Sequence, residues 1–442
     1  MTQFNRRDFL KTGSVAAAIA AGSTFTSAEE RQPDEPKPIR VGVVGTGSRG
    51  RWHIVNMLKY QENVEVPAVC DIKPSALAAG VQTVKDITGK TPDAYGENGD
   101  EYAYRKLCER DDLDAVVAST PSKWLGRMSI DALNAGKHAS HEVPGCYTIE
   151  ECHEMVQAEE KSGKYCMLLE NCCYERNTMM LMNMIRQGVF GEPYFGVGSY
   201  VHDCRHYFFD SAGKLTWRGD LYTEAHGAAY NPHGLGSPSK WLGINDGDRF
   251  ESCICMSTTP REVKKHAAKV YGADSPQANL PYIHGDFVTT LIQTAMGREI
   301  RIDYSLSCTR PYSRYYLLQG TNGCFDSRVG MYIEGVTEKA HEKWDDIGSY
   351  YEKYDNPYWL AGCEEAARCG GHGGIDYFVI HDFVKMVREN KRPWIDVYDA
   401  ATWASILHFS KLSLDRGGNR VEVDDFTGGR WKDPDWRKDA FV

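Results

Sequence analysis

The amino-acid sequence predicts an α/β protein with an N-terminal Rossmann domain built on a parallel sheet and a C-terminal α+β domain built on a mixed, largely antiparallel sheet. Three observations predict this fold. Short apolar, β-branched runs alternate with helical patterns up to Asn171, which favours right-handed βαβ crossovers. A glycine-rich turn follows the first of these runs. After about Asn177, β-like runs are separated by long polar loops, as is typical of antiparallel sheets.

The elements of the first domain follow from its apolar runs and its helix signals. Gly136 ends one helix, and Thr148 with Glu151 forms a capping box that begins another. We expect this domain to span residues 39–171. Its expected strands are 39–44, 64–71, 113–120, 137–143 and 165–171, and its expected helices cover about 51–60, 74–87, 121–135 and 149–160.

The second domain, residues 172–442, is expected to combine long loops with strands and to finish in two helices. A polar, glycine-rich segment from 203 to 238 is interpreted as a long functional loop. The other expected elements are a helix to about 187, strands near 194–202, 250–257, 286–296, 299–308 and 314–319, and helices near 375–390 and 398–415.

The N-terminus has the pattern of an export signal. Arg6 and Arg7 precede an uncharged stretch, 12–28, and small residues permit cleavage after Ala28. This stretch is shorter than the ~20 residues that span a bilayer, so no stable membrane anchor is expected. We therefore interpret 1–28 as a twin-arginine signal and 29–38 as a charged, proline-rich linker, and expect a periplasmic protein that is a client of the twin-arginine export machinery.

Composition excludes some classes of function. There are 51 Lys and Arg against 61 Asp and Glu, a formal net charge of −10 with no long basic run, which disfavours nucleic acid. The fourteen cysteines show neither a disulfide framework nor zinc-site spacing, so we predict free, mostly buried thiols and no metal. Free thiols are compatible with export because the twin-arginine route carries proteins that have already folded in a reducing cytoplasm.

The glycine turn predicts a dinucleotide site. The sequence Gly-Thr-Gly-Ser-Arg-Gly directly follows a buried strand and begins a helix, and Asp71 stands twenty-one residues beyond Gly50 at the end of the second strand. Asp71 would bind the ribose hydroxyls and favour NAD over NADP, although Arg49 beside the ribose could weaken that preference. The alternative is a surface turn with a solvated Asp. The cofactor-binding residues expected from this turn are Gly45, Gly47, Gly50 and Asp71.

The sequence His-Glu-Val-Pro-Gly at 141–145, with the Rossmann start, resembles the glucose–fructose oxidoreductase and inositol dehydrogenase (Gfo/Idh/MocA) superfamily. Dehydrogenases of that superfamily carry a Lys, their catalytic acid/base, where this chain has Val143. A simple hydride-transfer enzyme would therefore lack its proton donor. An exported sugar oxidoreductase remains the second hypothesis, since another acid could replace the Lys, and a non-catalytic binding protein is the third.

Further motifs are similar to those of glycoside hydrolase family 109, the NAD-dependent α-N-acetylgalactosaminidases. They are LENCCY at 169–174, YNPHGLG at 230–236, RPY at 310–312 and GHGGIDYF at 371–378, and the resemblance runs from about 39 to 431. It implies a glycan or small-molecule sugar substrate and a redox route to cleavage, an exception to the two-carboxylate pattern. Carbon 3 is oxidised by NAD, the carbon 2 proton is removed, the aglycone is eliminated, water adds and the hydride returns, so NAD is retained.

The resemblance also implies the site residues. The residues that it places along the cofactor are Ser48, Arg49, Asp71, Glu142, Val143 and Asn171. It also places Ser122, Trp124 and Leu125 near the nicotinamide, where the family typically has Trp at 122 and His at 125. The implied sugar contacts are Tyr174, Arg218, Tyr230, Asn231, Pro232, His233 and Tyr312, with Arg205 as a second-rank contact.

Tyr174 and His233 are the implied proton-transfer residues. Imidazole has an unperturbed pKa of about 6.5, and the positive nicotinamide could lower the pKa of Tyr174 from about 10. Which residue moves which proton stays open. Taken singly, each could instead be a core aromatic or a loop histidine with satisfied hydrogen bonds. By analogy with the superfamily, a homo-oligomer is also expected.

Overall fold

The computed structural model describes residues 37–337 and 343–440. The predicted signal, 1–28, and nearly all of the predicted linker, 29–38, lie outside the described residues. The chain from Pro38 onward forms one compact unit. Two sheets organise it, one built from strands before Leu168 and the other from strands after Pro193.

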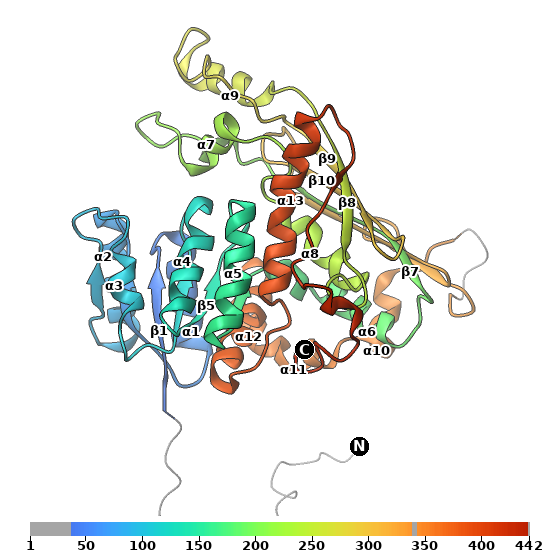
Figure 1. Cartoon of the computed structure of the whole chain (residues 1–442), viewed down its shortest axis with the longest axis horizontal. Helices are drawn as coiled ribbons and strands as arrows, with labels where there is room; N and C mark the ends of the chain where they lie inside the picture. Colours follow the sequence, from blue (N-terminus) through green and yellow to red (C-terminus); the bar gives the residue numbers. More distant parts are fainter. Residues whose placement is uncertain (1–36, 338–342, 441–442) are drawn as a thin grey trace, which may run out of the picture. The chain divides into compact units, whose positions relative to one another are not determined.

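The first sheet is the predicted parallel Rossmann sheet (Figure 1). Strand order is β3-β2-β1-β4-β5-β6 and every pair is parallel, which puts β1 in the centre. The strands are β1 (Ile39–Val44), β2 (Val64–Cys70), β3 (Asp93–Tyr95), β4 (Ala115–Ala118), β5 (His138–His141) and β6 (Cys166–Leu168). The helices are α1 (Ser48–Tyr60), α2 (Pro74–Thr88), α3 (Tyr104–Cys108), α4 (Ser122–Asn134) and α5 (Ile149–Ser162).

Local signals account for most of these elements. Val43 is fully buried and pairs with Val69 and Val117 of the flanking strands, as expected for a central parallel strand. The side chain of Thr148 caps α5 by accepting from the backbone N–H of Glu151. The sequence did not predict β3 and α3, because three and five residues are too short to show a period.

The second sheet is mixed, as predicted. Strand order is β13-β12-β11-β7-β10-β9-β8-β14, and only the β7–β10 pair is parallel. The strands are β7 (Pro193–Val201), β8 (Phe250–Ser257), β9 (Val288–Thr294), β10 (Glu299–Ser305), β11 (Ser313–Gly320), β12 (Gly323–Asp326), β13 (Gly330–Ile333) and β14 (Val421–Glu422).

Helices join the two sheets. In Figure 1, α13 (Val397–Asp415) stands between α5 of the Rossmann domain and β8 of the second sheet, and it contacts both. Helix α12 (Ile375–Glu389) contacts α1 and the short 3₁₀ helix Asn171–Tyr174. The remaining helices are α6 (Arg176–Arg186), α7 (Trp217–Glu224), α8 (Pro232–Trp241), α9 (Glu262–Tyr271), α10 (Tyr351–Tyr354) and α11 (Pro357–Cys369).

The prediction that 203–238 is one long loop was wrong, because α7 lies within it and α8 begins in it. The glycines within α8 allow close packing, whereas Gly213 and Gly227 have positive φ and lie in turns. A Cβ at Gly198 of β7 would lie 1.6 Å from the backbone oxygen of Gly234 in α8, so helix and strand meet backbone to backbone. A glycine-rich helix of this kind has the composition of a loop.

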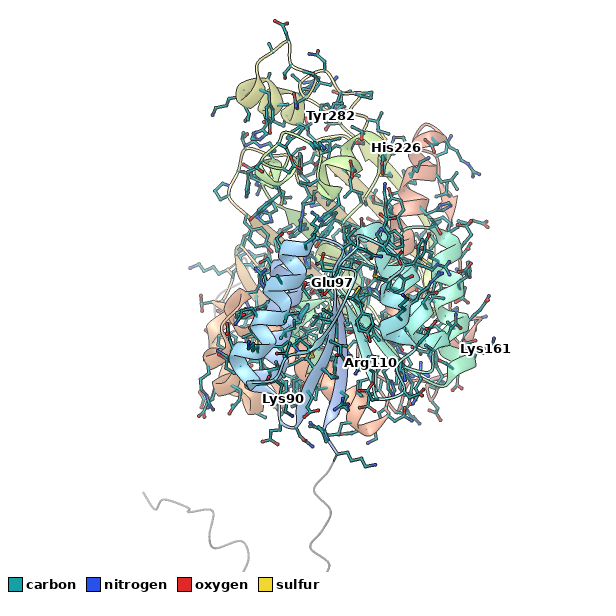
Figure 2. All side chains as sticks on the ribbon, turned by 90° about the vertical axis from the view of Figure 1, so that its left-hand side faces the viewer. Lys90, Glu97, Arg110, Lys161, His226 and Tyr282 are labelled. Carbon is teal, nitrogen blue, oxygen red and sulfur yellow. The ribbon has the colours of Figure 1, made fainter. Side chains whose placement is uncertain are left out.

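All fourteen cysteines lie in the described part of the chain and all are free thiols, eleven of them buried. No described helix combines the length and the apolar character needed to cross a bilayer. Figure 2, which looks onto the Rossmann side, shows Lys90 and Arg110 at its lower end, and His226 and Tyr282 in the second domain above it.

Candidate active site

A single large cleft runs along the carboxyl edge of the Rossmann strands and continues under the second domain. Its volume is about 1150 Å³, more than the ~300–1,000 Å³ of most small-molecule sites, which leaves room for a dinucleotide and a sugar together. Thirteen of the sequence-predicted residues line it: Gly45, Gly47, Ser48, Arg49, Asp71, Trp124, Glu142, Val143, Asn171, Arg218, Tyr230, His233 and Tyr312.

The three glycines of the turn have three different roles. Gly45 has a φ of +85°, which lets the chain turn sharply out of β1. A Cβ at Gly47 would meet no atom within 4 Å, so a ligand can approach the backbone there. A Cβ at Gly50 would lie 1.8 Å from the oxygen of Gly45, so Gly50 is buried and permits close packing instead of lining the cleft. This is the arrangement that binds pyrophosphate at a helix N-terminus.

Asp71 is positioned for a ribose. Its Oδ2 accepts from the backbone N–H of Thr46 at 2.8 Å, and its Oδ1 accepts from the backbone N–H of Lys73 at 2.9 Å. These bonds fix the carboxylate at the end of β2 beside the glycine turn. Carboxylate oxygens accept from both ribose hydroxyls, so these residues fit a bound NAD.

Arg49 ties the glycine turn to both domains. Its Nε lies 2.6 Å from Glu142 Oε1 after β5, and its Nη1 lies 2.7 Å from Asp376 Oδ2 in α12. Asn171 donates to Asp376 at 2.7 Å, and His53 Nε2 lies 2.7 Å from Glu142. Arg49 is therefore committed to two carboxylates, and the expectation that it could weaken the NAD preference gains no support from this geometry.

This cluster shifts the pKa of both carboxyl groups. Burial alone would raise the pKa of Glu142, but the charge of Arg49 and the hydrogen bond from His53 outweigh it and hold the pKa below its usual range. The pKa of Asp376 is likewise lowered, since His372 and Arg49 outweigh its burial. Both carboxylates are thus kept ionised next to the cofactor turn.

At the position where the resemblance places the nicotinamide, the cleft contains Val143 rather than a proton donor. Val143 is buried and lines the cleft directly after Glu142. Among the described residues that line the cleft, the only lysine is Lys73, which follows Asp71 at the ribose end. A residue that transfers protons in this cleft must therefore be another titratable group.

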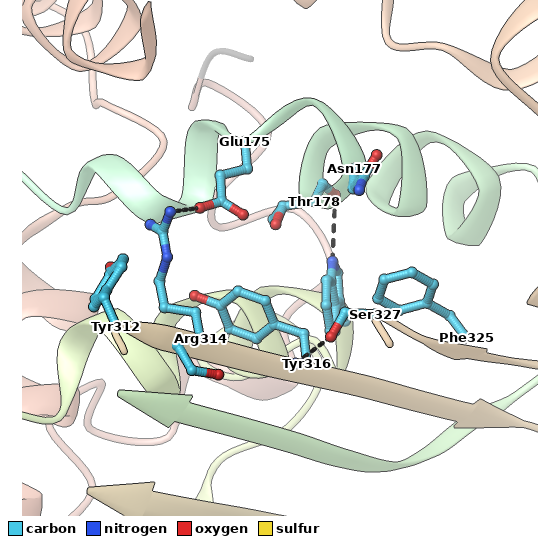
Figure 3. A pocket seen from close by; sticks show the side chains of 10 residues that line it. Glu175, Asn177, Thr178, Tyr312, Arg314, Tyr316, Phe325 and Ser327 are labelled. Atoms are coloured by element: carbon cyan, nitrogen blue, oxygen red, sulfur yellow. Dashed lines mark hydrogen bonds and ion pairs between the residues drawn. The ribbon is translucent and has the colours of Figure 1, made fainter. Parts of the chain in front are cut away.

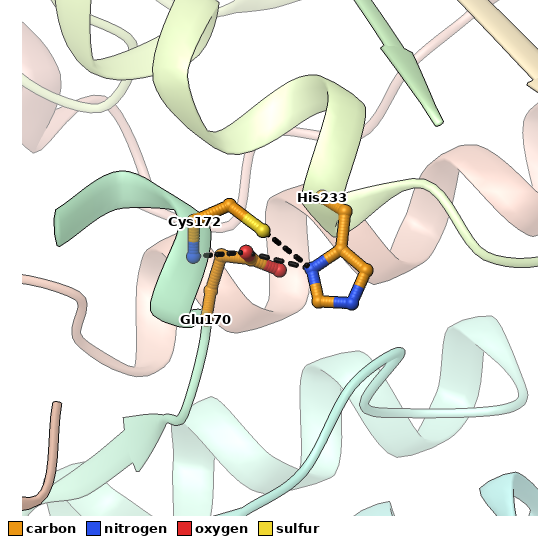
Figure 4. A group of neighbouring side chains, drawn as sticks. All are labelled: Glu170, Cys172 and His233. Atoms are coloured by element: carbon orange, nitrogen blue, oxygen red, sulfur yellow. Dashed lines mark hydrogen bonds and ion pairs between the residues drawn. The ribbon is translucent and has the colours of Figure 1, made fainter. Parts of the chain in front are cut away.

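His233 supplies such a group. It lies in the first turn of α8, and its Nδ1 lies 2.8 Å from Glu170 Oε1 and 3.2 Å from Cys172 Sγ (Figure 4). Figure 4 shows the second ring nitrogen on the side away from these two residues. Because His233 lines the cleft, that nitrogen is available to a ligand.

Glu170, Cys172 and His233 also offer ligand atoms within 4.8 Å of one another, a set that could hold a metal ion. Spacing along the chain does not show this set, because its residues come from two distant segments. The distances of 2.8 and 3.2 Å are those of hydrogen bonds. The Arg314 guanidinium, 2.6 Å from Cys172 Sγ, would also repel a cation.

Aromatic side chains of the second domain line another part of the cleft, called the sugar end here because the resemblance implies that it binds the sugar. Tyr200 stacks on Tyr230 with ring centroids 5.6 Å apart and meets Tyr312 edge-on at 5.7 Å. Its hydroxyl lies 3.0 Å from His202 Nδ1. Tyr200 and His202 line the cleft, but the sequence analysis did not assign them to the site; the alternation of β7, which ends at Val201, is the signal that could have found them.

Arg218 lies beside this aromatic group. Its guanidinium stacks over Trp217 at 4.1 Å and lies 5.7 Å from Tyr207. Within the described residues it has no hydrogen bond or ion pair, so its N–H donors remain available to a ligand.

The structure does not place Tyr174 in the cleft. Its side chain is fully buried, does not line the cleft, and donates to Asp382 at 2.7 Å. Burial and the Asp382 carboxyl raise the pKa of Tyr174 well above its usual value, the opposite of an activated base. The reason is the 3₁₀ period, which turns Asn171 and Tyr174 alike toward α12, where Asn171 meets Asp376 at the cleft and Tyr174 meets Asp382 in the core.

Five other predicted contacts also lie outside the cleft lining. Asn231 is buried and donates to the backbone oxygen of Trp403, and Pro232 is the buried first residue of α8. Arg205 is held by Asp203 and Glu262. Ser122 and Leu125 are buried in the first turn of α4, and of that loop only Trp124 reaches the cleft.

A smaller cavity of about 300 Å³ adjoins the sugar end and shares Tyr312 and Arg314 with it (Figure 3). Arg314 forms an ion pair with Glu175 at this boundary. The pair separates the two spaces and holds the guanidinium beside Cys172.

The fold and the glycine turn define an NAD-binding Rossmann protein of the Gfo/Idh/MocA class. Residues 39–169 match the family model described as "Oxidoreductase family, NAD-binding Rossmann fold". Residues 174–433 match the family model described as "Glycosyl hydrolase 109, C-terminal domain". The chain belongs to glycoside hydrolase family 109 and is therefore a glycosidase by family, with a carbohydrate substrate.

Relatives cover nearly the whole chain. A "Glycosyl hydrolase family 109 protein" of Shewanella pealeana is 37% identical over 97% of this chain and 98% of its own. A protein of Shewanella oneidensis named "Alpha-N-acetylgalactosaminidase" is 36% identical, with 98% of each chain covered.

Solved structures share the fold at lower identity. A levoglucosan dehydrogenase in complex with NADH and L-sorbose is similar with a TM-score of 0.68 and 18% identity, over 88% of this chain and 100% of that one. A myo-inositol dehydrogenase of Lactobacillus casei in complex with NAD(H) and myo-inositol is similar with a TM-score of 0.59 and 16% identity, over 88% and 97%.

Proposed function

We propose that this protein hydrolyses α-linked N-acetylgalactosaminides by oxidation, elimination, addition and reduction, with NAD retained through the cycle. The observation that carries the proposal is that the cofactor turn and the His233 ring open into one cleft. Membership of family 109 and the relative named for this activity support the choice of sugar.

Each end of the cleft has its own task. The glycine turn and Asp71 would hold NAD, which when bound supplies reversible acceptance of a hydride from carbon 3 of the sugar. The carbon 3 hydroxyl releases its proton to solvent as the hydride leaves. A carbon 2 proton beside the resulting ketone is then acidic enough for a protein base to remove, and the carbon 1 substituent leaves by elimination and takes up a proton. Water adds across the new double bond, and the hydride and the hydroxyl proton return to carbon 3 and its oxygen. His233 is the group that accepts and returns a proton, while Arg218, Tyr230 and Tyr312 orient the sugar.

The test uses purified protein with no added nicotinamide nucleotide, incubated with 4-nitrophenyl α-N-acetylgalactosaminide in deuterated water. We expect release of nitrophenol, deuterium at carbon 2 of the product and unchanged bound NAD. The β-linked anomer serves as the matched control for stereochemistry. Oxidation of the sugar without bond cleavage would instead identify an oxidoreductase, and inertness towards a panel of sugars would identify a binding protein.

We further propose export to the periplasm by the twin-arginine route. The Arg6-Arg7 pair and the fourteen free thiols support it, because folding in a reducing cytoplasm preserves free cysteines. The test replaces both arginines with lysine and compares periplasmic with cytoplasmic fractions. We expect the wild-type chain in the periplasm and the double variant in the cytoplasm; equal distribution of the two would contradict the proposal.

A further inference from the structure

A buried carboxyl group lies behind the proton-transfer histidine. Glu170 is fully buried at the end of β6, and its Oε1 contacts His233 Nδ1 at 2.8 Å. The same oxygen accepts from the backbone N–H of Cys172 at 2.9 Å, so the carboxyl group cannot turn away from the ring. Its Oε2 is buried and has no partner within the described residues.

The ring itself is held from the other side. The Tyr316 hydroxyl donates to the backbone oxygen of His233 at 2.5 Å, and the ring packs against Tyr200 with centroids 4.7 Å apart. The backbone beneath it is seated on β7 through Gly234 and Gly198. The imidazole therefore has one orientation, with Nδ1 towards Glu170 and Nε2 towards the cleft (Figure 4).

This contact decides which ring nitrogen carries the proton. Oε1 already accepts the backbone N–H of Cys172, so it faces the ring as an acceptor. Nδ1 therefore donates to it, and Nε2 of the neutral ring keeps a free lone pair. Cys172 does not compete for the Nδ1 proton, because burial and Glu170 raise the pKa of its thiol well above the usual value and a neutral sulfur is a weak acceptor.

We propose that Glu170 is the positioning residue of the reaction: it fixes the Nδ1–H tautomer of His233, so that Nε2 meets the sugar as a base. The proton that leaves the sugar bonds to Nε2, the Nδ1 proton stays in place, and its hydrogen bond to Glu170 becomes charge-assisted as the ring becomes cationic. This assignment rests on the proposed function for its catalytic meaning, whereas the tautomer itself is a property of the protein alone.

The first measurement does not depend on activity. Long-range ¹H–¹⁵N correlation spectra distinguish protonated from unprotonated ring nitrogens. They are recorded on ¹⁵N-histidine-labelled holoenzyme at a pH where the ring is neutral, and a His233→Gln variant identifies the His233 signals. We expect Nδ1–H in the wild type. In Glu170→Gln the amide can donate to Nδ1, so we expect the population to move to the Nε2–H tautomer.

The second measurement compares turnover with cofactor content. In Glu170→Gln we expect kcat to fall about 10²–10⁴-fold with KM and bound NAD little changed, and Glu170→Asp to recover part of the loss. Glu175→Gln is the matched control, because Glu175 is a nearby carboxyl group that pairs with Arg314 rather than with His233. We expect its His233 signals to match the wild type.

The outcomes separate this inference from the proposed function. A wild-type enzyme with the Nε2–H tautomer, or a Glu170→Gln variant with an unchanged tautomer and unchanged kcat, would overturn the role of Glu170. So would a stoichiometric metal ion in the holoenzyme that is lost in His233→Gln, since Nδ1 would then be a ligand. If the chain cleaves no N-acetylgalactosaminide but shows the predicted tautomer and its inversion, the proposed function fails and the positioning contact stands.

Discussion

The cofactor half and the sugar half of the cleft differ in how many of their polar atoms are already bound within the protein. In the cofactor half, Arg49 is paired with Glu142 and Asp376, and Asp71 accepts from two backbone N–H groups. In the sugar half, Arg218 and the hydroxyls of Tyr230 and Tyr312 have no hydrogen-bond partner within the described residues.

The difference matches two kinds of occupant. A half whose groups are fixed beforehand loses little conformational freedom on binding, which suits a cofactor that stays. A half with free donors and acceptors exchanges hydrogen bonds with water for hydrogen bonds with a ligand, which suits a substrate that arrives and leaves. The following predictions test this division, in order of decreasing effect.

Replacing His233 with Ala should separate the two halves most clearly. We expect kcat for the N-acetylgalactosaminide to fall about 10²–10⁴-fold, because a proton-transfer group is lost, while bound NAD stays near the wild-type amount. Steady-state kinetics and nucleotide extraction measure the two quantities. Comparable loss of NAD would show that the two halves are not independent.

Asp376→Asn should weaken the cofactor half. Its charge neutralises Arg49 in a buried position, so we expect the free energy of unfolding to fall by about 3 kcal/mol at neutral pH, together with loss of bound NAD. Because the pKa of Asp376 is lowered in the folded state, this contribution is present at neutral pH and is lost as the pH falls below about 4. Urea unfolding at several pH values measures it; a difference independent of pH would contradict the ion pair.

Asp382, which lies outside both halves of the cleft, should give the free energy of unfolding a pH dependence of the opposite sign. Burial raises its pKa to about 7, so the folded protein keeps a proton that the unfolded chain releases above about 4. We therefore expect stability to fall as the pH rises from about 4 to 7, by roughly 2–4 kcal/mol, and to level off above that. Asp382→Asn should remove this pH-dependent part of the stability. The measurement is the shift in the urea unfolding midpoint between pH 5 and pH 8, compared between the wild type and Asp382→Asn.

Tyr174→Phe should have the smallest effect on activity. We expect kcat to stay within about twofold of the wild type and the free energy of unfolding to fall by about 1–2 kcal/mol, because Asp382 loses a donor. Tyr312→Phe, at a hydroxyl that lines the sugar half, is the matched comparison and should reduce kcat/KM more. Equal losses of activity in the two variants would indicate that Tyr174 contacts the substrate after all.

The two halves also differed in how far the sequence could predict them. The cofactor half consists of one turn and the end of the next strand, so spacing along the chain identified Gly45, Gly47 and Asp71 without knowledge of packing. In the sugar half, the residues come from several separate segments, and the direction of each side chain depends on tertiary contacts. Tyr174 faces α12 and Asn231 faces the Trp403 backbone, which no motif could indicate, and Tyr200 reaches the cleft from a strand that carries no motif.

The backbone contact between Gly198 and Gly234 has a consequence for how this site can change. The imidazole of His233 belongs to helix α8. The distance between this helix and the sheet is set by Gly198 and Gly234, which have no Cβ and meet backbone to backbone. Alanine at position 198 would push the helix away from the strand and carry the ring away from Glu170, although position 198 touches neither NAD nor sugar. Substitution of Gly198 is thus constrained by the position of His233, although Gly198 itself contacts no ligand.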